Sequence, residues 1–127
     1  GKIKQFGVSN FTSSQVDLIS NDIDISANQI EFSLTEYSAM HNGILDQMMI
    51  KNITPMSWSP LGNVFREDNE QTRRIHKQLG LLMDKYSATE DQLLLAWKFK
   101  HPSNIHPVIG TTTKNRIVDA VKATAIQ

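Results

Sequence analysis

Residues suited to ligand chemistry gather in four short segments of the chain: GVSN (7–10), NQIEFS (28–33), WSPLG (58–62) and IGTTT (109–113). Their serine, asparagine, glutamine and threonine side chains can hydrogen-bond an amide, and their tryptophan can stack on a flat ring. Their glycines let bare backbone approach a phosphate. Together the segments can bind a ligand that carries an amide, a ring and phosphate groups.

A helix is predicted to begin at Thr113, its expected N-cap. Lys114 and Arg116 then fall in the first turn. This is the positive end of the helix dipole, where acidic residues are preferred and cations are disfavoured. The helix is predicted from apolar residues that recur at helical spacing, namely Ile117, Val118, Val121 and Ala125. The two cations at its start therefore call for an explanation.

Sequence patterns also predict the elements that position these segments. Strand-like stretches cover residues 2–11, 25–33, 54–62 and 105–110, and helical stretches cover 12–20, 43–52, 70–86, 89–100 and the segment from Thr113 onward. Capping boxes are expected at Thr12 with Gln15 and at Thr89 with Gln92. This alternation predicts an α/β fold with a parallel sheet and crossover helices. Ligands of such folds bind at the carboxyl ends of the strands, where the four segments lie.

Composition narrows the classes of protein that remain. The 127 residues include 13 basic and 13 acidic side chains, so no net charge points to nucleic acid. Cysteine is absent, and the four histidines show no i, i+4 pairing, so no metal site is expected. No apolar run reaches the ~18 residues of a membrane helix, and the first residues do not resemble a signal peptide. We expect a single cytoplasmic domain without membrane or nucleic-acid partners.

Four segments in order resemble the aldo-keto reductase family. GKIKQFGVSNF, NQIEFS, PMSWSPLG and VIGTTTKNRIVDA resemble the fifth to eighth strands of that family's (β/α)8 TIM barrel and the helix after the last. The sequences FGVSNF and WSPLG resemble those of the bacterial members more than those of the mammalian reductases. The resemblance runs through residues 1–127, and it implies that the chain covers about the second half of the barrel, which carries the NADP(H)-binding loops.

The resemblance also implies roles for individual residues. Three polar residues would hold the nicotinamide carboxamide, and Trp58 would stack on the ring. A turn would line the pyrophosphate, and the last loop and helix would contact the adenosine phosphates. In chain order these residues are Ser9, Asn10, Gln29, Trp58, Ser59, Pro60, Leu61, Gly62, Gly110, Thr111, Thr112, Arg116 and Asp119. Many members carry lysine in place of Gly110 and asparagine in place of Ala120.

A dinucleotide at the last helix would explain its first-turn cations. Its phosphates would meet the backbone N–H groups, the helix dipole and Arg116 together. By the same resemblance, Arg116 would meet the 2′-phosphate or the adenine, with Asp119 on the adenosine side. The extra phosphate favours NADP(H) over NAD(H) as the cofactor.

The family reduces a carbonyl with a tyrosine proton donor that comes from loops after earlier strands. Tyr37 and His41 match no catalytic position, so no catalytic residue is assigned to this chain. The parent protein is expected to reduce aldehydes or ketones with NADP(H), whereas the chain alone is expected to be inactive. We expect it to self-associate or to pair with the missing N-terminal half. The alternatives are a non-catalytic nucleotide-binding module and an α/β protein-interaction module that binds no nucleotide.

Three polar or aromatic residues also have a structural interpretation. Trp97 lies in an apolar helix and is expected in the core. Asn28 could be a satisfied polar group inside the sheet. His76 lies beside Arg73, Arg74 and Lys77, which indicates a solvated helix face.

Overall fold

A computed structural model describes residues 1–126 of the chain. It contains a four-stranded sheet in the order β1 (Phe6–Ser9), β2 (Ile25–Glu31), β3 (Thr54–Trp58) and β4 (His106–Pro107), and every adjacent pair is parallel. The predicted parallel α/β architecture is therefore confirmed. The last strand is much shorter than the expected residues 105–110. Pro107 has no N–H to give to the ladder, and pairing ends with Val108 N donating to Ser57 O at 2.9 Å.

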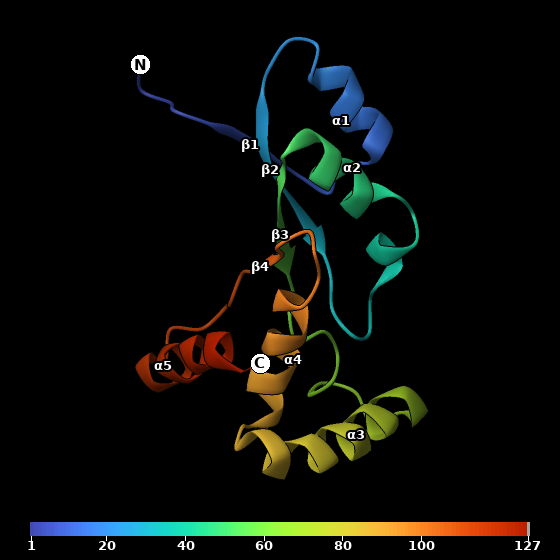
Figure 1. Ribbon diagram of the computed structural model, residues 1–127, viewed down its shortest axis with the longest axis vertical. Helices are drawn as coiled ribbons and strands as arrows, with labels where there is room; N and C mark the ends of the chain where they lie inside the picture. Colours follow the sequence, from blue (N-terminus) through green and yellow to red (C-terminus); the bar gives the residue numbers. More distant parts are fainter. Residues whose placement is uncertain (127) are drawn as a thin grey trace.

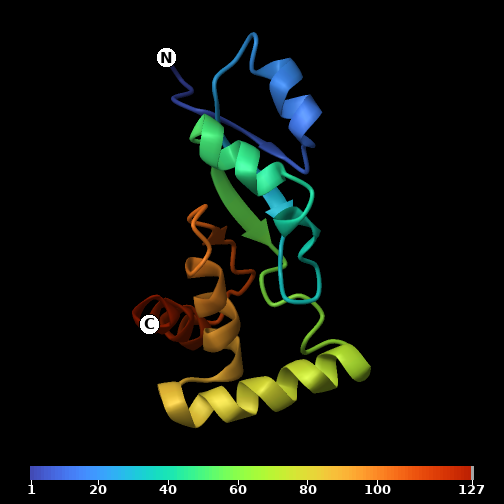
Figure 2. The ribbon, with the colours of Figure 1, turned by 45° about the vertical axis from the view of Figure 1, so that its right-hand side comes forward.

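Helices follow the strands as crossovers (Figure 1). They are α1 (Ser13–Ile19), α2 (Ile44–Lys51), α3 (Glu70–Tyr86), α4 (Glu90–Phe99) and α5 (Lys114–Lys122), with 3-10 turns η1 (Ser38–Met40) and η2 (Ala123–Ala125). The two views place α1 and α3 at opposite ends of the molecule (Figure 2). None of the helices in residues 1–126 is long and apolar enough to span a membrane.

Both predicted capping boxes are present. In α1, Thr12 N donates to Gln15 Oε1 at 2.9 Å, and Gln15 N donates to Thr12 Oγ1 at 3.3 Å. In α4, Thr89 N donates to Gln92 Oε1 at 3.0 Å, and the Thr89 hydroxyl donates to Asp91. These bonds satisfy backbone and side-chain groups that the first turn of a helix otherwise leaves unpaired.

The main core lies between the sheet and the helices α1 and α2. Its buried apolar side chains include Val16, Ile30, Phe32, Leu45, Met48 and Ile105. Asn28 is fully buried there, and its side chain exchanges hydrogen bonds with the backbone of Phe11, so its interpretation as a satisfied polar group is confirmed. Met49, which follows the buried Met48 in α2, is 39% exposed.

Helix α4 is buried nearly all round, as its apolar sequence predicted. Trp97 stacks on Phe32 with ring centroids 5.2 Å apart, which confirms its place against the core. Lys98 is also fully buried, which the sequence did not indicate. Its ammonium group donates to Phe32 O and lies over the Phe32 ring, and burial lowers the pKa of Lys98 to about 7.

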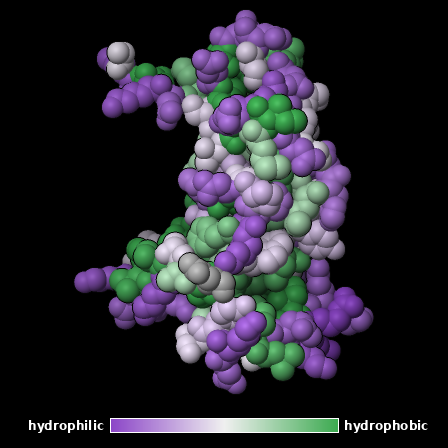
Figure 3. All heavy atoms as spheres, viewed as in Figure 1, coloured by the Kyte–Doolittle hydropathy of each residue, from purple (hydrophilic) through white to green (hydrophobic). Residues whose placement is uncertain are grey.

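Helix α5 forms as predicted, but it contains no buried residue. Ile117, Val118 and Val121 are 42%, 50% and 61% exposed. Figure 3 shows hydrophobic atoms at the surface over this helix. The apolar stripe that predicted α5 therefore has no covering element among residues 1–126, although a helix of this pattern ordinarily packs that stripe against a core.

Candidate functional site

The first predicted ligand residues meet where β1 ends beside β2. Ser9 Oγ and Asn10 N both donate to Gln29 O, at 3.2 and 2.8 Å. Asn10 has a φ of 56°, in the left-handed region that asparagine tolerates better than most residues. This conformation turns the chain out of the strand directly after Ser9.

Trp58 joins this group from the end of β3. Its indole Nε1 donates to Asn10 Oδ1 at 2.9 Å. Gln29 pairs in register with Met56, two residues before Trp58, so the Gln29 and Trp58 side chains leave the same face of the sheet. That face is the less buried one in both strands. Asn10, Gln29 and Trp58 therefore lie on one open face at the carboxyl ends of three neighbouring strands.

The turn after β3 is built on two left-handed residues, Ser59 and Gly62, with φ of 47° and 57°. Gly62 N donates to Ser59 O at 2.8 Å and closes the turn. A Cβ on Gly62 would lie 2.1 Å from Thr35 Oγ1 and 2.5 Å from Ser33 Oγ. Asn63 N also donates to Thr35 Oγ1 at 3.0 Å. Only glycine fits here, and the loop after β2 fixes the turn in place.

A cleft of about 1030 Å³ opens between this turn, the start of α4 and the start of α5. Eight of the predicted cofactor residues line it: Trp58, Ser59, Pro60, Leu61, Gly62, Gly110, Thr111 and Arg116. A Cβ built on Gly110 would meet nothing within 4 Å, so the backbone there faces open space. Residues from two of the four predicted segments, 58–62 and 109–113, thus line one cleft together with Arg116 and the start of α4.

The other five predicted residues lie outside the lining of this cleft. Asn10 lines an adjoining hollow of about 650 Å³, which shares Trp58 with the cleft. Ser9, Gln29 and Thr112 line neither. The carboxylate of Asp119 accepts from Lys122 Nζ at 2.7 Å, which draws it along α5.

The N-terminus of α5 has no side-chain cap. Thr113 occupies the N-cap position as predicted, but its side chain makes no capping hydrogen bond. Its backbone N–H instead donates to Thr111 Oγ1 at 3.1 Å. No acidic residue stands in the first turn, and Arg116 is exposed on the cleft. This helix end keeps its positive dipole and adjacent cation available to an anion.

On the side of the cleft formed by α4, His76 connects the start of that helix with the segment after β3. Its Nδ1 lies 2.9 Å from Glu90 Oε1, and its Nε2 lies 2.9 Å from Val64 O. These partners, with the coulombic effect of Asp68, raise the pKa of His76, the Glu90 hydrogen bond contributing most. The helix face around His76 is solvated as predicted, with the His76 side chain 38% exposed, but the sequence did not indicate the two partners of its ring. Position in the sequence could not reveal partners that lie 12 and 14 residues away.

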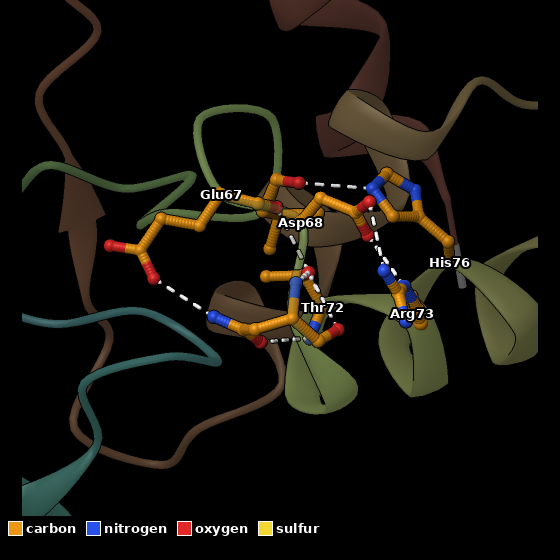
Figure 4. Close-up of polar contacts among 7 residues, drawn as sticks. Glu67, Asp68, Thr72, Arg73 and His76 are labelled. Carbon is orange, nitrogen blue, oxygen red and sulfur yellow. Dashed lines mark hydrogen bonds and ion pairs between the residues drawn. The ribbon is translucent and has the colours of Figure 1, made fainter.

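Figure 4 shows the neighbouring contacts at the start of α3. Asn69 caps the helix, accepting from Thr72 N at 2.9 Å, and the Thr72 hydroxyl donates to Glu67 O at 2.9 Å. Arg73 binds both oxygens of Asp68, at 2.6 and 3.0 Å, and this lowers the pKa of the carboxyl. The segment between β3 and α3 is thus held by many local hydrogen bonds. Within the described residues, no group of His, Asp or Glu is arranged to hold a metal ion.

Comparison with known proteins agrees with this geometry. The family model of the "Aldo/keto reductase family" matches residues 1–127. The chain belongs to the aldo-keto reductase family. It is 36% identical to the "uncharacterized oxidoreductase YcsN" of Bacillus subtilis and 33% identical to "oxidoreductase YdhF" of Escherichia coli. These alignments cover 97% and 100% of the chain. It is also 31% identical to a "6-dehydroglucose reductase" of Novosphingobium aromaticivorans.

Solved aldo-keto reductases share the fold. The thermostable Tm1743, in complex with the inhibitor epalrestat, superposes with a TM-score of 0.82 at 22% identity over 97% of this chain. The aldose reductase of Giardia lamblia gives a TM-score of 0.78 at 25% identity over the whole chain. The chain spans 43% and 41% of those two structures, and 43% to 44% of the three relatives named above. The four strands and their helices are therefore part of the family's TIM barrel.

Proposed function

We propose that the protein is an NADP(H)-dependent oxidoreductase that reduces aldehydes or ketones to alcohols, and that this chain supplies its cofactor-binding half. The observation that carries the proposal is the cleft between the turn after β3 and the uncapped start of α5. It combines a glycine-containing turn, an open backbone at Gly110 and the guanidinium of Arg116. This is a donor set suited to a chain of phosphates.

The nicotinamide would lie at the open face where the three strands end. Ser9, Asn10 and Gln29 would bind the carboxamide, and Trp58 would stack on the ring. The hydrogen bond from Trp58 to Asn10 supports this arrangement because it fixes the indole and the amide relative to each other. When bound, the reduced nicotinamide supplies the hydride.

The phosphates would extend from that face into the cleft. Residues 59–62 would line the pyrophosphate, and Gly110, Thr111 and Thr112 would contact the adenosine phosphates. Arg116 would bind the 2′-phosphate of NADP(H), since a guanidinium can donate two parallel hydrogen bonds to one phosphate. Asp119 would stay on the adenosine side, held by Lys122.

The proton donor for the developing alkoxide would come from outside this chain, which would form the C-terminal half of the barrel. The relatives are more than twice as long as the matched segment, which supports this division. The sheet edges at β1 and β4 would then pair with the rest of the barrel or with a second copy.

The direct test is NADPH oxidation by the complete gene product with a panel of aldehydes and ketones. The panel includes 6-dehydroglucose, because relatives carry the name 6-dehydroglucose reductase. We expect substrate-dependent oxidation that falls in Asn10→Ala and persists in Arg74→Ala, a change on the exposed surface of α3. NADPH binding without turnover on any carbonyl would favour the non-catalytic module. Absence of binding by the folded protein would contradict the proposal.

A further inference from the structure

His76 lies between two acceptors on opposite sides of its ring. Nδ1 faces the Glu90 carboxylate, at 2.9 and 3.0 Å from its two oxygens, and Nε2 faces Val64 O at 2.9 Å. A neutral imidazole has one N–H and one lone pair, so it can satisfy only one of these acceptors. In either tautomer the other nitrogen would point a lone pair at an oxygen. Only the imidazolium form satisfies both contacts.

The charges around His76 favour the same form. Glu90 belongs to the first turn of α4, and Asp68 acts on the ring from the segment before α3. Asp68 is itself bound by Arg73, on the same helix as His76, so the two charges largely offset each other at the ring and Glu90 is the main anion. The ring forms a T-shaped pair with Phe65, with ring centroids 5.7 Å apart. The anionic partner Glu90 therefore faces the ring directly.

The hydrogen bond to Val64 O connects His76 to the segment that forms part of the cleft wall. Val64 is 1% exposed and packs in the cluster formed by α3 and α4. The next two residues, Phe65 and Arg66, line the cleft, as does Glu90. On the other side, Asn63 is held by Thr35. The wall segment 63–66 is thus held at its first residue by the loop after β2 and at its second by His76.

We propose that His76 is a positioning residue whose protonated form holds segment 63–66 in the cleft wall, so that nucleotide affinity falls as His76 loses its proton. This inference rests on the proposed function for its ligand but not for the contact itself. Deprotonation breaks one of the two hydrogen bonds and releases either Glu90 or Val64. Because the pKa is raised above its usual 6.5, the contact is complete in acid and is lost as pH rises through that higher value.

The contact is tested first without nucleotide, by NMR on the complete gene product. We expect His76 to titrate above 6.5, and Glu90→Gln to move its midpoint to lower pH. Arg66 N and Glu67 N both donate to Asn63 O at 3.0 Å, so their exchange protection reports the segment. That protection, corrected for intrinsic exchange, should fall through the same midpoint. Protection independent of pH, or a midpoint at or below 6.5, would overturn the proposal.

The coupling to ligand is tested by NADPH titration between pH 6 and 9. The 2′-phosphate itself titrates, with a pKa of about 6, so each dissociation constant is compared with that of His76→Gln at the same pH. We expect the wild type to bind about fivefold more tightly at pH 6 and about equally at pH 9, the size of effect that one charge-assisted hydrogen bond allows. His41→Gln, a control away from the cleft, should match the wild type throughout.

The two tests separate the two proposals. Exchange protection that falls with rising pH, together with an affinity ratio that changes with pH, supports both proposals. A ratio that does not change with pH overturns the coupling even if NADPH binds well. Absence of NADPH binding at every pH contradicts the proposed function and the coupling, while the exchange data still decide whether His76 holds the segment.

Discussion

Helices α4 and α5 both begin at the same cleft, and their first turns are opposite in character. At α4, the capping box of Thr89 and Gln92 occupies the helix start, two acidic residues follow, and Glu90 is bound by His76. At α5, Thr113 makes no capping bond, and the first turn contains Lys114 and Arg116 but no acid. The protein's own side chains satisfy the first helix end, whereas the second has no side-chain cap and no acidic residue in its first turn.

The two helices also differ in how many of their side chains are buried. Helix α4 buries six residues, including Lys98, whereas α5 buries none. Packing therefore fixes α4, and α4 can serve as a rigid wall. Helix α5 follows the two-residue strand β4 and contacts α4, where Gln92 Nε2 donates to Asp119 O at 3.0 Å. Because α5 buries no side chain of its own, its stability depends more on local interactions.

The largest expected effect is on stability, from a substitution in the turn after β3 that lines the cleft with the starts of α4 and α5. Gly62→Ala would place a Cβ within 2.5 Å of Ser33 Oγ, in a left-handed conformation that alanine disfavours. We expect unfolding free energy to drop by about 2–4 kcal/mol, measured by urea denaturation. The control is Gly80→Ala in α3, where a Cβ meets nothing and stability should rise by about 0.5–1 kcal/mol. Equal effects at both glycines would contradict the packing described for the turn.

The burial of Lys98 predicts a dependence of stability on pH. Its pKa is about 7 in the fold and 10.5 in the unfolded chain, so the unfolded state binds the extra proton between these values. Unfolding free energy should therefore rise with pH across this window, with a slope of up to ~1.4 kcal/mol per pH unit. Denaturation of Lys98→Met at pH 7.5 and 9.5 should lack this contribution. An unchanged slope in the variant would show that another group causes it.

The two N-caps offer a matched pair of substitutions. Thr89→Ala removes the hydroxyl that takes part in the capping box of α4 and donates to Asp91, and it should lower stability by about 1 kcal/mol. Thr113→Ala removes a side chain without a capping bond and should change stability by less than about 0.3 kcal/mol. Thermal unfolding of the two variants measures both values. A larger cost at Thr113 would remove the distinction between the two helix starts.

A small effect of opposite sign is expected from Lys114→Glu. An acid in the first turn of α5 suits the helix dipole and should stabilise the protein without nucleotide by about 0.3–1 kcal/mol at low salt. The same change should weaken NADPH binding, because it repels phosphate from the helix end. Lys85→Glu in α3 makes the same charge change away from the cleft and should leave affinity unaltered. If Lys114→Glu improved both stability and binding, the phosphates would have to lie elsewhere.

Local sequence signals predicted the parallel sheet, the helices and two capping boxes, because each depends on residues close in the chain. The convergence of Trp58, the turn and Arg116 on one cleft also followed from the rule that strand ends meet at one edge. The burial of Lys98 and the partners of His76 were missed because they depend on contacts across 66 and 14 residues. The exposure of α5 was missed because an apolar stripe shows that a face can be buried, not what covers it.

Calorimetric titration with NADPH and NADH, on the wild type and Arg116→Ala, tests the central claim most directly. The uncapped start of α5 is proposed to bind the 2′-phosphate through Arg116, so the substitution should weaken NADPH binding by about 10- to 100-fold. Binding of NADH, which lacks that phosphate, should change by less than about twofold. Arg74→Ala should alter neither. Equal weakening of both nucleotides, or of neither, would contradict the assignment of this helix end to the phosphate.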